Sequence, residues 1–332
     1  MKPSLLEKAL PAIITSRIPY LLSGPPGVGK SQIIGQVVGK MGLQLIDLRL
    51  VDKDPVDLTG LPRFDEDGTV RWGRPWFLPR DGAGVIFIDE ITSADEAVQK
   101  PCLQLVHDRR IGEHVLPDGW AVLAAGNREW DLAGAKRLIS SLNNRFAHGE
   151  LDIDLNDWCL WADRAGIMTE IIAFLRYREG LLHDFDPRSD TFDPARRAYA
   201  TPRSWELASN MFRADPPAEA QHELLDGIVG EAPATEFMGF LKVAKSLPSP
   251  DAILLNPMTA TVPDQPSTQL LVTQALAKRA TPDNFDRVCA YANRLPVEFN
   301  VRLVNEAKEL EPAVQSTRAF NVWAAENHQA LN

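Results

Sequence analysis

A glycine-rich segment near the amino terminus has the residue types and spacing that bind nucleotide phosphates. It consists of Gly24, Pro25, Pro26, Gly27, Val28, Gly29, Lys30 and Ser31, and it fits the P-loop pattern. The glycines allow backbone N–H groups to curl around phosphate oxygens, and the amino terminus of a following helix adds partial positive charge. We expect Lys30 to reach the β- and γ-phosphates of ATP and the Ser31 hydroxyl to ligate Mg²⁺.

A pair of carboxylates supplies the second part of this chemistry. Asp89 and Glu90 directly follow an apolar run at residues 85–88, which places them at the carboxyl end of a buried strand, where α/β sheets bind ligands. We expect Asp89 to hold the magnesium through water and Glu90 to polarise the attacking water. An Asp-Glu pair is also common in surface turns, but the P-loop upstream favours the catalytic interpretation.

Three further polar side chains are candidates for the same site. Asn127 ends the run at residues 122–126, where its amide can orient water near the γ-phosphate; a turn-forming Asn after Gly is the alternative. Arg145 precedes the last candidate strand and is placed to reach an adjoining subunit, unless it is a solvated loop charge. Arg203 falls in the first turn of a helix that begins with Thr201 and Pro202. A cation there interacts unfavourably with the helix dipole, which suggests that an anion binds next to Arg203.

The elements that must position these residues alternate between strand and helix. Short, nearly unbroken apolar runs, typical of strands buried on both faces of a parallel sheet, occur at residues 20–22, 43–48, 85–88 and 120–125. A fifth candidate, at residues 146–153, is more polar and suggests an edge strand. Apolar residues between the first two runs recur at helical spacing, so the pattern predicts a doubly wound α/β domain over residues 1–154.

After residue 154 the pattern predicts only helices. Asn156 is a candidate cap for the first of them, and others are expected at residues 171–177, 202–212 and 219–229, with a long loop at 185–201. Prolines make the connection at residues 248–266 irregular, and helix breaks are expected before Pro282, Pro296 and Pro312. We therefore expect a helical lid over residues 155–247 and a C-terminal helical extension over residues 248–332.

Composition excludes several classes of protein. The 332 residues are 45% hydrophobic and 24% charged, as in globular proteins, and 45 acidic against 35 basic residues give a formal charge of −10, which argues against a nucleic-acid coat. The few, distant cysteines (Cys102, Cys159 and Cys289) indicate neither a zinc site nor a disulfide scaffold. No run is long enough for a membrane helix, and charged residues interrupt the amino terminus, so we expect a cytoplasmic protein.

The order of these motifs resembles that of the AAA+ ATPases over about residues 20–212. The P-loop, Asp89-Glu90, Asn127, Arg145 and Arg203 stand where that family has Walker A, Walker B, sensor 1, arginine finger and sensor 2. The segment at residues 57–60, followed by a hairpin, resembles the MoxR branch. The likeness implies a strand order of 5-1-4-3-2, a helical lid, a hexameric ring and a von Willebrand A-type partner. Asn144 stands where the family often has an acidic residue, which leaves Arg137 open as the finger.

Two expected hairpins are candidates for contact with a client. The first covers residues 64–79 with a turn at Asp67-Gly68, and the second covers residues 109–120 with a turn at residues 117–119. In the family such insertions face the ring pore and touch the client. The alternative is that the aromatic side chains of Trp72, Trp76 and Phe77 pack the hairpin onto its own domain.

The residues and the resemblance together predict a ring-forming ATPase that remodels a protein client or partner. A nucleic-acid motor or the NTPase subunit of a restriction system is the alternative, which the acidic balance disfavours. A small-molecule kinase with the same P-loop is disfavoured, because it needs neither the Asn127 strand nor a helical second domain with an anion-facing arginine.

Overall fold

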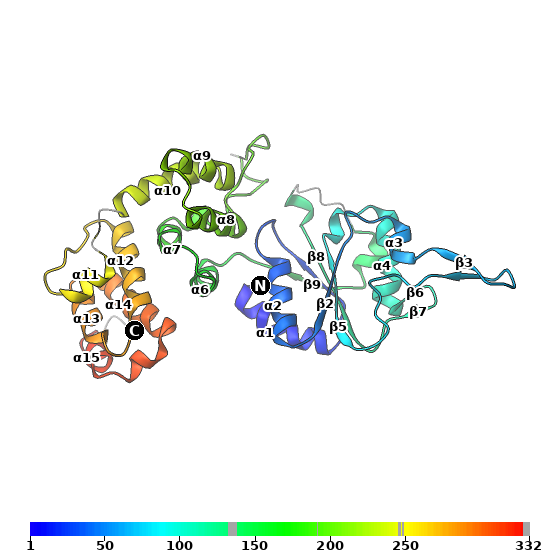
Figure 1. The fold of residues 1–332 in the computed structure, drawn as a ribbon, viewed down its shortest axis with the longest axis horizontal. Helices are drawn as coiled ribbons and strands as arrows, with labels where there is room; N and C mark the ends of the chain where they lie inside the picture. The colour runs from blue at the N-terminus through cyan, green and yellow to red at the C-terminus, as the bar shows by residue number, and fades with distance from the viewer. Residues whose placement is uncertain (132–137, 191, 245–246, 248, 328–332) are drawn as a thin grey trace. The chain divides into compact units, whose positions relative to one another are not determined.

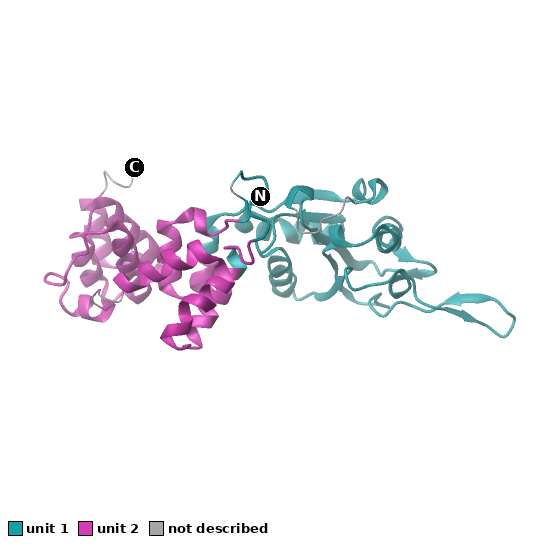
Figure 2. Ribbon diagram, turned by 90° about the horizontal axis from the view of Figure 1, so that it is seen from above, with its two compact units in different colours: residues 1–158, 185–195, 201–203 teal, residues 159–184, 196–200, 204–332 magenta. Residues whose placement is uncertain are grey.

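The computed structural model describes the chain except for residues 132–137, 191, 245–246, 248 and 328–332. It divides into two compact units (Figure 2). Unit 1 contains residues 1–158, 185–195 and 201–203, and unit 2 contains residues 159–184, 196–200 and 204–332. The expected boundaries after residues 154 and 247 stay predictions.

Unit 1 is built on a parallel sheet of five strands (Figure 1). The strands are β1 (Tyr20–Ser23), β2 (Gln44–Arg49), β5 (Ala83–Asp89), β8 (Gly119–Gly126) and β9 (Ala147–Glu150). Their spatial order is β2-β5-β8-β1-β9, and every neighbouring pair is parallel. Numbered along the chain without the hairpin strands, this is the order 5-1-4-3-2 that the resemblance implied, so the expected α/β fold class is confirmed.

Helices cover both faces of the sheet. The apolar side of α1 (Pro3–Thr15) and α2 (Lys30–Lys40) packs with Val85 and Phe87 of β5 in one cluster. The intervening residues Ile86 and Ile88 belong to a second cluster, with α3 (Pro55–Thr59), α4 (Glu96–Asp108) and α5 (Ser140–Asn143). Alternate side chains of β5 are thus buried on opposite faces, which explains its unbroken apolar run.

The sequence predicts one edge strand of the sheet correctly and the other wrongly. The polar strand β9 lies at one edge, as expected. Strand β2 lies at the other edge and is mostly exposed, so the prediction that it is buried on both faces is wrong. With a neighbouring strand on one side only, side chains such as Leu45, which is 36% exposed, lack contacts that the central strands provide.

Both expected hairpins are present, but one has its turn elsewhere. Strands β3 (Pro62–Phe64) and β4 (Val70–Trp72) pair antiparallel around Asp67-Gly68, and this hairpin projects from the rest of unit 1 (Figure 1). The second hairpin, β6 (Arg110–Ile111) and β7 (His114–Val115), turns at residues 112–113. The turn expected at 117–119 is present, since the Trp120 backbone donates to the Pro117 carbonyl at 3.1 Å, but it leads from β7 into β8. Gly112 adopts a φ of 58° there, a conformation that glycine reaches without strain.

The aromatic side chains beside the first hairpin take different positions. Phe77 is buried, with 1% of its surface exposed, and belongs to a core cluster of unit 1. Trp72 and Trp76 are 44% and 70% exposed. The packing interpretation therefore holds for Phe77, whereas Trp72 and Trp76 leave much of their apolar surface to solvent.

The described residues after β9 form helices and loops without further strands. The α-helices are α6 (Leu155–Ala165), α7 (Thr169–Tyr177), α8 (Pro202–Arg213), α9 (Ala218–Val229), α10 (Glu231–Ala244), α11 (Pro250–Leu255), α12 (Pro266–Arg279), α13 (Phe285–Ala292), α14 (Val297–Leu310) and α15 (Arg318–Glu326). The breaks expected before Pro282, Pro296 and Pro312 are confirmed. Within the chain segments that the structure describes, no helix has the length and apolar character needed to cross a membrane.

Two expectations about these helices need correction. Helix α6 begins at Leu155, and Asp154 rather than Asn156 caps it, because the Asp154 Oδ1 accepts a hydrogen bond from the Asp157 backbone at 2.9 Å. The connection expected to be irregular around residues 248–266 contains the short helix α11, which Ser249 caps through the Ala252 backbone.

Candidate nucleotide-binding site

The glycine-rich segment joins β1 to α2 at the carboxyl edge of the sheet. Gly27 and Gly29 have φ values of 75° and 91°, which side chains larger than hydrogen rarely allow. Gly29 directly precedes α2, and within the described residues no side chain caps the first turn of this helix. The loop therefore presents a helix amino terminus with the polarity that binds anions.

Lys30 is the partly buried cation of this loop. Its Nζ donates to the carbonyl oxygens of Gly24 at 2.7 Å and Pro25 at 2.9 Å, and to the Asn127 Oδ1 at 2.9 Å. Burial lowers the pKa of Lys30 from 10.5 to about 8, while the carboxylates of Asp131 and Asp89 oppose that shift. An anion in the loop would favour the charged form of this amine.

Ser31 and Asp89 meet as the sequence predicts. The Ser31 hydroxyl donates to the Asp89 Oδ2 at 2.7 Å, and the Glu90 backbone donates to the Asp89 Oδ1 at 2.9 Å. Mg²⁺ is commonly held by one or two protein oxygens together with nucleotide phosphates and waters. The Ser31 hydroxyl and the Asp89 carboxylate offer two such oxygens side by side. In the described part of the chain no group of three or more histidine, cysteine or acidic residues is placed to hold a metal.

Glu90 occupies an unusual backbone conformation at the end of β5. Its φ is 55° and its side chain is exposed, directly before the 3₁₀ helix η1 (Ile91–Ser93). A left-handed conformation is uncommon for residues other than glycine and often marks a functional turn. The turn separates the exposed Glu90 carboxylate from the buried Asp89 carboxylate, as two different roles would require.

Arg203 reaches the P-loop from a distant part of the sequence. Its backbone N–H donates to the Gly27 carbonyl at 3.1 Å, and its charge contributes to lowering the pKa of Lys30. A Cβ atom on Gly27 would lie 2.7 Å from the Thr201 Oγ1, so the glycine permits this close approach. The structure thus brings Arg203 together with Lys30, Ser31, Asp89 and Asn127.

Arg145 is not part of this group. It lies two residues before β9, and β9 runs parallel to β1, so Arg145 is at the amino-terminal edge of the sheet, opposite to the P-loop. Its Nη1 donates to the Ser141 carbonyl at 2.6 Å. The other candidate for the same role, Arg137, lies outside the described residues.

Sequence reasoning missed a pair of charges next to Lys30. Asp131 is 1% exposed and accepts hydrogen bonds from the Arg128 guanidinium, which also donates to the Glu150 Oε1 at 2.7 Å. In the sequence, only the nearness of Arg128 and Asp131 to Asn127 points to this pair. The contact of Arg128 with Glu150 in β9 cannot be read from the sequence, because it depends on the strand order.

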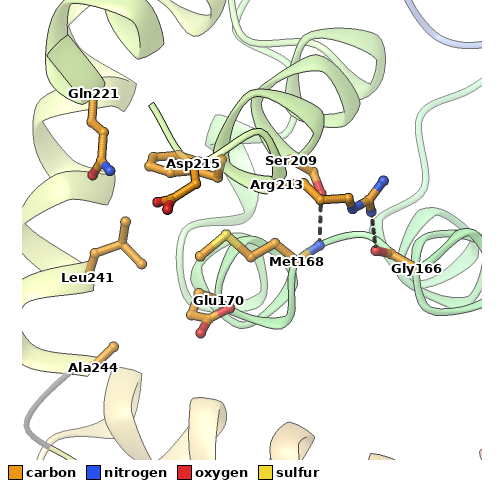
Figure 3. Close-up of a pocket in the computed structure, with 10 residues that line it drawn as sticks. Gly166, Met168, Glu170, Ser209, Arg213, Asp215, Gln221, Leu241 and Ala244 are labelled. Atoms are coloured by element: carbon orange, nitrogen blue, oxygen red, sulfur yellow. Dashed lines mark hydrogen bonds between the residues drawn. The ribbon is translucent and has the colours of Figure 1, made fainter. Parts of the chain in front are cut away.

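Unit 2 contains a pocket of its own, of about 400 Å³ (Figure 3). Residues from α7, α8, α9 and α10, and from the segments before α7 and after α8, line it. Two polar groups at its wall are already engaged, because Arg213 donates to the Gly166 carbonyl at 2.7 Å and the Met168 backbone donates to the Ser209 Oγ at 3.0 Å. None of the residues predicted for the nucleotide site lines this pocket.

Two curated proteins are similar to part of the chain. CbbQ of Hydrogenophilus thermoluteolus is 34% identical over 152 residues, which are 42% of this chain and 55% of CbbQ. Midasin of Giardia intestinalis is 32% identical over 155 residues, which are 43% of this chain and 3% of midasin. The matches therefore span about half of CbbQ and a small part of midasin.

Other comparisons add little. No protein-family model matches the chain. Among solved structures, the RuvB Holliday junction branch migration motor of Thermotoga maritima aligns with a TM-score of 0.40 and 19% identity, covering 73% of this chain and 67% of that one. A similarity at this level supports no conclusion about function.

Nucleotide binding is expected to take up protons above neutral pH. With the pKa of Lys30 at about 8, about half of the free chains carry a neutral amine at pH 8, and bound phosphates favour the ammonium form. Binding of ADP should therefore take up about half a proton per site at pH 8 and about a tenth at pH 7. Calorimetric titrations in buffers of different ionisation enthalpy measure this uptake, and a binding enthalpy independent of buffer at pH 8 would contradict it.

Proposed function

Since the chain belongs to the MoxR-like group of the AAA+ ATPases, we propose that it hydrolyses ATP with Mg²⁺ to remodel a protein client or partner. The observation that carries the proposal is the meeting of Lys30, Ser31, Asp89 and Asn127 at one edge of the sheet, beside the exposed carboxylate of Glu90. A partly buried cation, a hydroxyl–carboxylate pair, an amide and an exposed carboxylate are the groups that phosphoryl transfer to water requires.

Each residue has a separate task in the proposed reaction. Lys30 and the amino terminus of α2 bind the phosphates, and Ser31 and Asp89 hold the metal ion. Mg²⁺, when bound, supplies positive charge that neutralises the phosphate oxygens. Glu90 polarises the attacking water and accepts its proton, while the Asn127 amide orients that water.

Arg145 is proposed to act on the nucleotide of a neighbouring subunit in a hexameric ring. Its place at the sheet edge opposite to its own P-loop supports this, since it has no route to the phosphates bound by the same chain. A guanidinium is planar and always charged, so it can stabilise the charge that spreads over the γ-phosphoryl oxygens in the transition state.

The hairpin β3–β4 is the surface proposed to touch the client. Phe64, Trp72 and Trp76 are 76%, 44% and 70% exposed, which leaves an aromatic surface available for an unfolded or flexible segment. By family likeness, a von Willebrand A-type protein is the proposed partner. We also propose that the protein works in the cytoplasm, in keeping with its three free, buried cysteines.

Replacing the proposed base should separate ATP binding from hydrolysis. The Glu90→Gln variant keeps the shape of the side chain but cannot accept a proton, so kcat should fall by about 10²- to 10⁴-fold with ATP affinity unchanged. Glu96→Gln, an exposed residue in the first turn of α4, is the matched control and should retain the wild-type kcat. A wild-type rate in Glu90→Gln would exclude Glu90 as the base.

The same variant can identify the client. Proteins retained by Glu90→Gln in the presence of ATP, but not by a Lys30→Ala chain that lacks the phosphate-binding ammonium, are the expected clients. Stimulation of turnover by single-stranded DNA, with no protein retained, would favour the nucleic-acid motor instead.

Mixing two inactive variants tests the role of Arg145. Arg145→Ala should bind ATP but hydrolyse it about 10³- to 10⁵-fold more slowly, and Lys30→Ala should not bind it. Mixed rings contain interfaces with an intact P-loop and an intact finger, so part of the activity should return. If native mass spectrometry confirms mixed rings and no activity returns, Arg145 does not act between subunits.

A further inference from the structure

Thr92, a residue outside the sequence motifs, holds the backbone of Asn127 from one side. Its Oγ1 accepts a hydrogen bond from the Asn127 backbone N–H at 3.0 Å, and the side chain is only 7% exposed. A Cβ atom on Gly126 would lie 2.6 Å from the Thr92 Cγ2, so the glycine permits the two segments to touch. Thr92 lies in η1, two residues after Glu90, and thus links the turn of Glu90 to the end of β8.

Asp131 holds the same segment from the other side. Its Oδ2 accepts a hydrogen bond from the Arg128 backbone N–H at 2.9 Å, and its Oδ1 accepts one from the Arg128 Nη2 at 2.8 Å. The carboxylate is 1% exposed, so these hydrogen bonds satisfy a group that is costly to bury alone. The Arg128 side chain extends the contact to Glu150 at the end of β9.

The two contacts together fix the orientation of Asn127. The peptide groups before and after its Cα are each held by a buried side chain, which restricts both of its backbone dihedral angles. The direction of the Asn127 side chain follows from those angles, and its Oδ1 lies 2.9 Å from the Lys30 Nζ. Water could satisfy the same N–H groups at an exposed loop, but it could not fix their direction.

We propose that Thr92 and Asp131 are positioning residues for ATP hydrolysis, which act by fixing the Asn127 amide against the phosphate site. This inference rests on the proposed function. A displaced catalytic group commonly costs about 10²-fold in rate even when binding is retained, because the rate depends on geometry more steeply than affinity does. Replacing either residue should therefore lower kcat, and only in a chain that still has the Asn127 side chain.

A matched pair of substitutions isolates the hydrogen bond of Thr92. Thr92→Val keeps the shape but removes the acceptor, and it should lower kcat about 10- to 100-fold. The dissociation constant of a non-hydrolysable ATP analogue should stay within about twofold of wild type. Thr92→Ser retains the acceptor and should recover most of the rate. The positioning role of Thr92 would be overturned if Thr92→Val had the wild-type kcat. It would also be overturned if Thr92→Val and Thr92→Ser lowered kcat equally.

A double-mutant cycle with Asn127→Ala distinguishes positioning from general stability. In that background Thr92→Val should change kcat by no more than about twofold, because the group that it positions is already gone. A loss as large as in the wild-type background would show that Thr92 acts otherwise and would overturn the inference. Asp131→Asn is tested in the same cycle, and if that variant does not fold, the Thr92 pair decides.

Failure of this inference is distinguishable from failure of the proposed function. A wild-type chain that does not hydrolyse ATP in the presence of Mg²⁺ overturns the proposed function, and the positioning role with it. A wild-type chain that hydrolyses ATP, with Thr92→Val equally active, overturns the positioning role alone.

Discussion

The candidate site depends on the partly buried ammonium group of Lys30. The three N–H donors of Lys30 Nζ are matched by three oxygens, from Gly24, Pro25 and Asn127. All three oxygens are uncharged, so they satisfy the hydrogen bonds of the ammonium group without carrying a negative charge that would pair with it. Burial lowers the pKa of the amine to about 8. A phosphate group supplies the missing negative charge, which makes the free loop a receptor for an anion.

The strand order places the residues of the candidate site next to Lys30. Ser23 of β1 is level with Gly126 of β8, so the P-loop and Asn127 leave the sheet side by side. Strand β5 is the next neighbour of β8, which brings Asp89 within reach of the Ser31 hydroxyl. The P-loop and Asn127 would not lie side by side in a sheet whose strands followed their sequence order, because β2 and β5 would then separate β1 from β8.

Local patterns in the sequence predict the parts of this site, whereas the contacts between distant residues are not predictable from them. The P-loop and the two carboxylates after β5 are recognisable because their chemistry depends on residues close in sequence. Thr92 and Asn127 are 35 positions apart, and only their places just after the adjacent strands β5 and β8 bring them together. Residues 112–113 and 117–119 both form turns, and only strand pairing shows that the first of them closes the hairpin β6–β7. In the run at residues 43–48, only Gln44 and Asp47 indicate that β2 lies at an edge.

The most direct test of this account is an experimental structure of the chain with a non-hydrolysable ATP analogue and Mg²⁺. The account predicts that the Lys30 Nζ contacts the β- and γ-phosphates and has left the Asn127 Oδ1. It also predicts that the metal ion contacts the Ser31 Oγ at about 2.1 Å, with Asp89 beside it. A nucleotide bound elsewhere, or a Lys30 amine that keeps its three present partners with the analogue in place, would contradict the account.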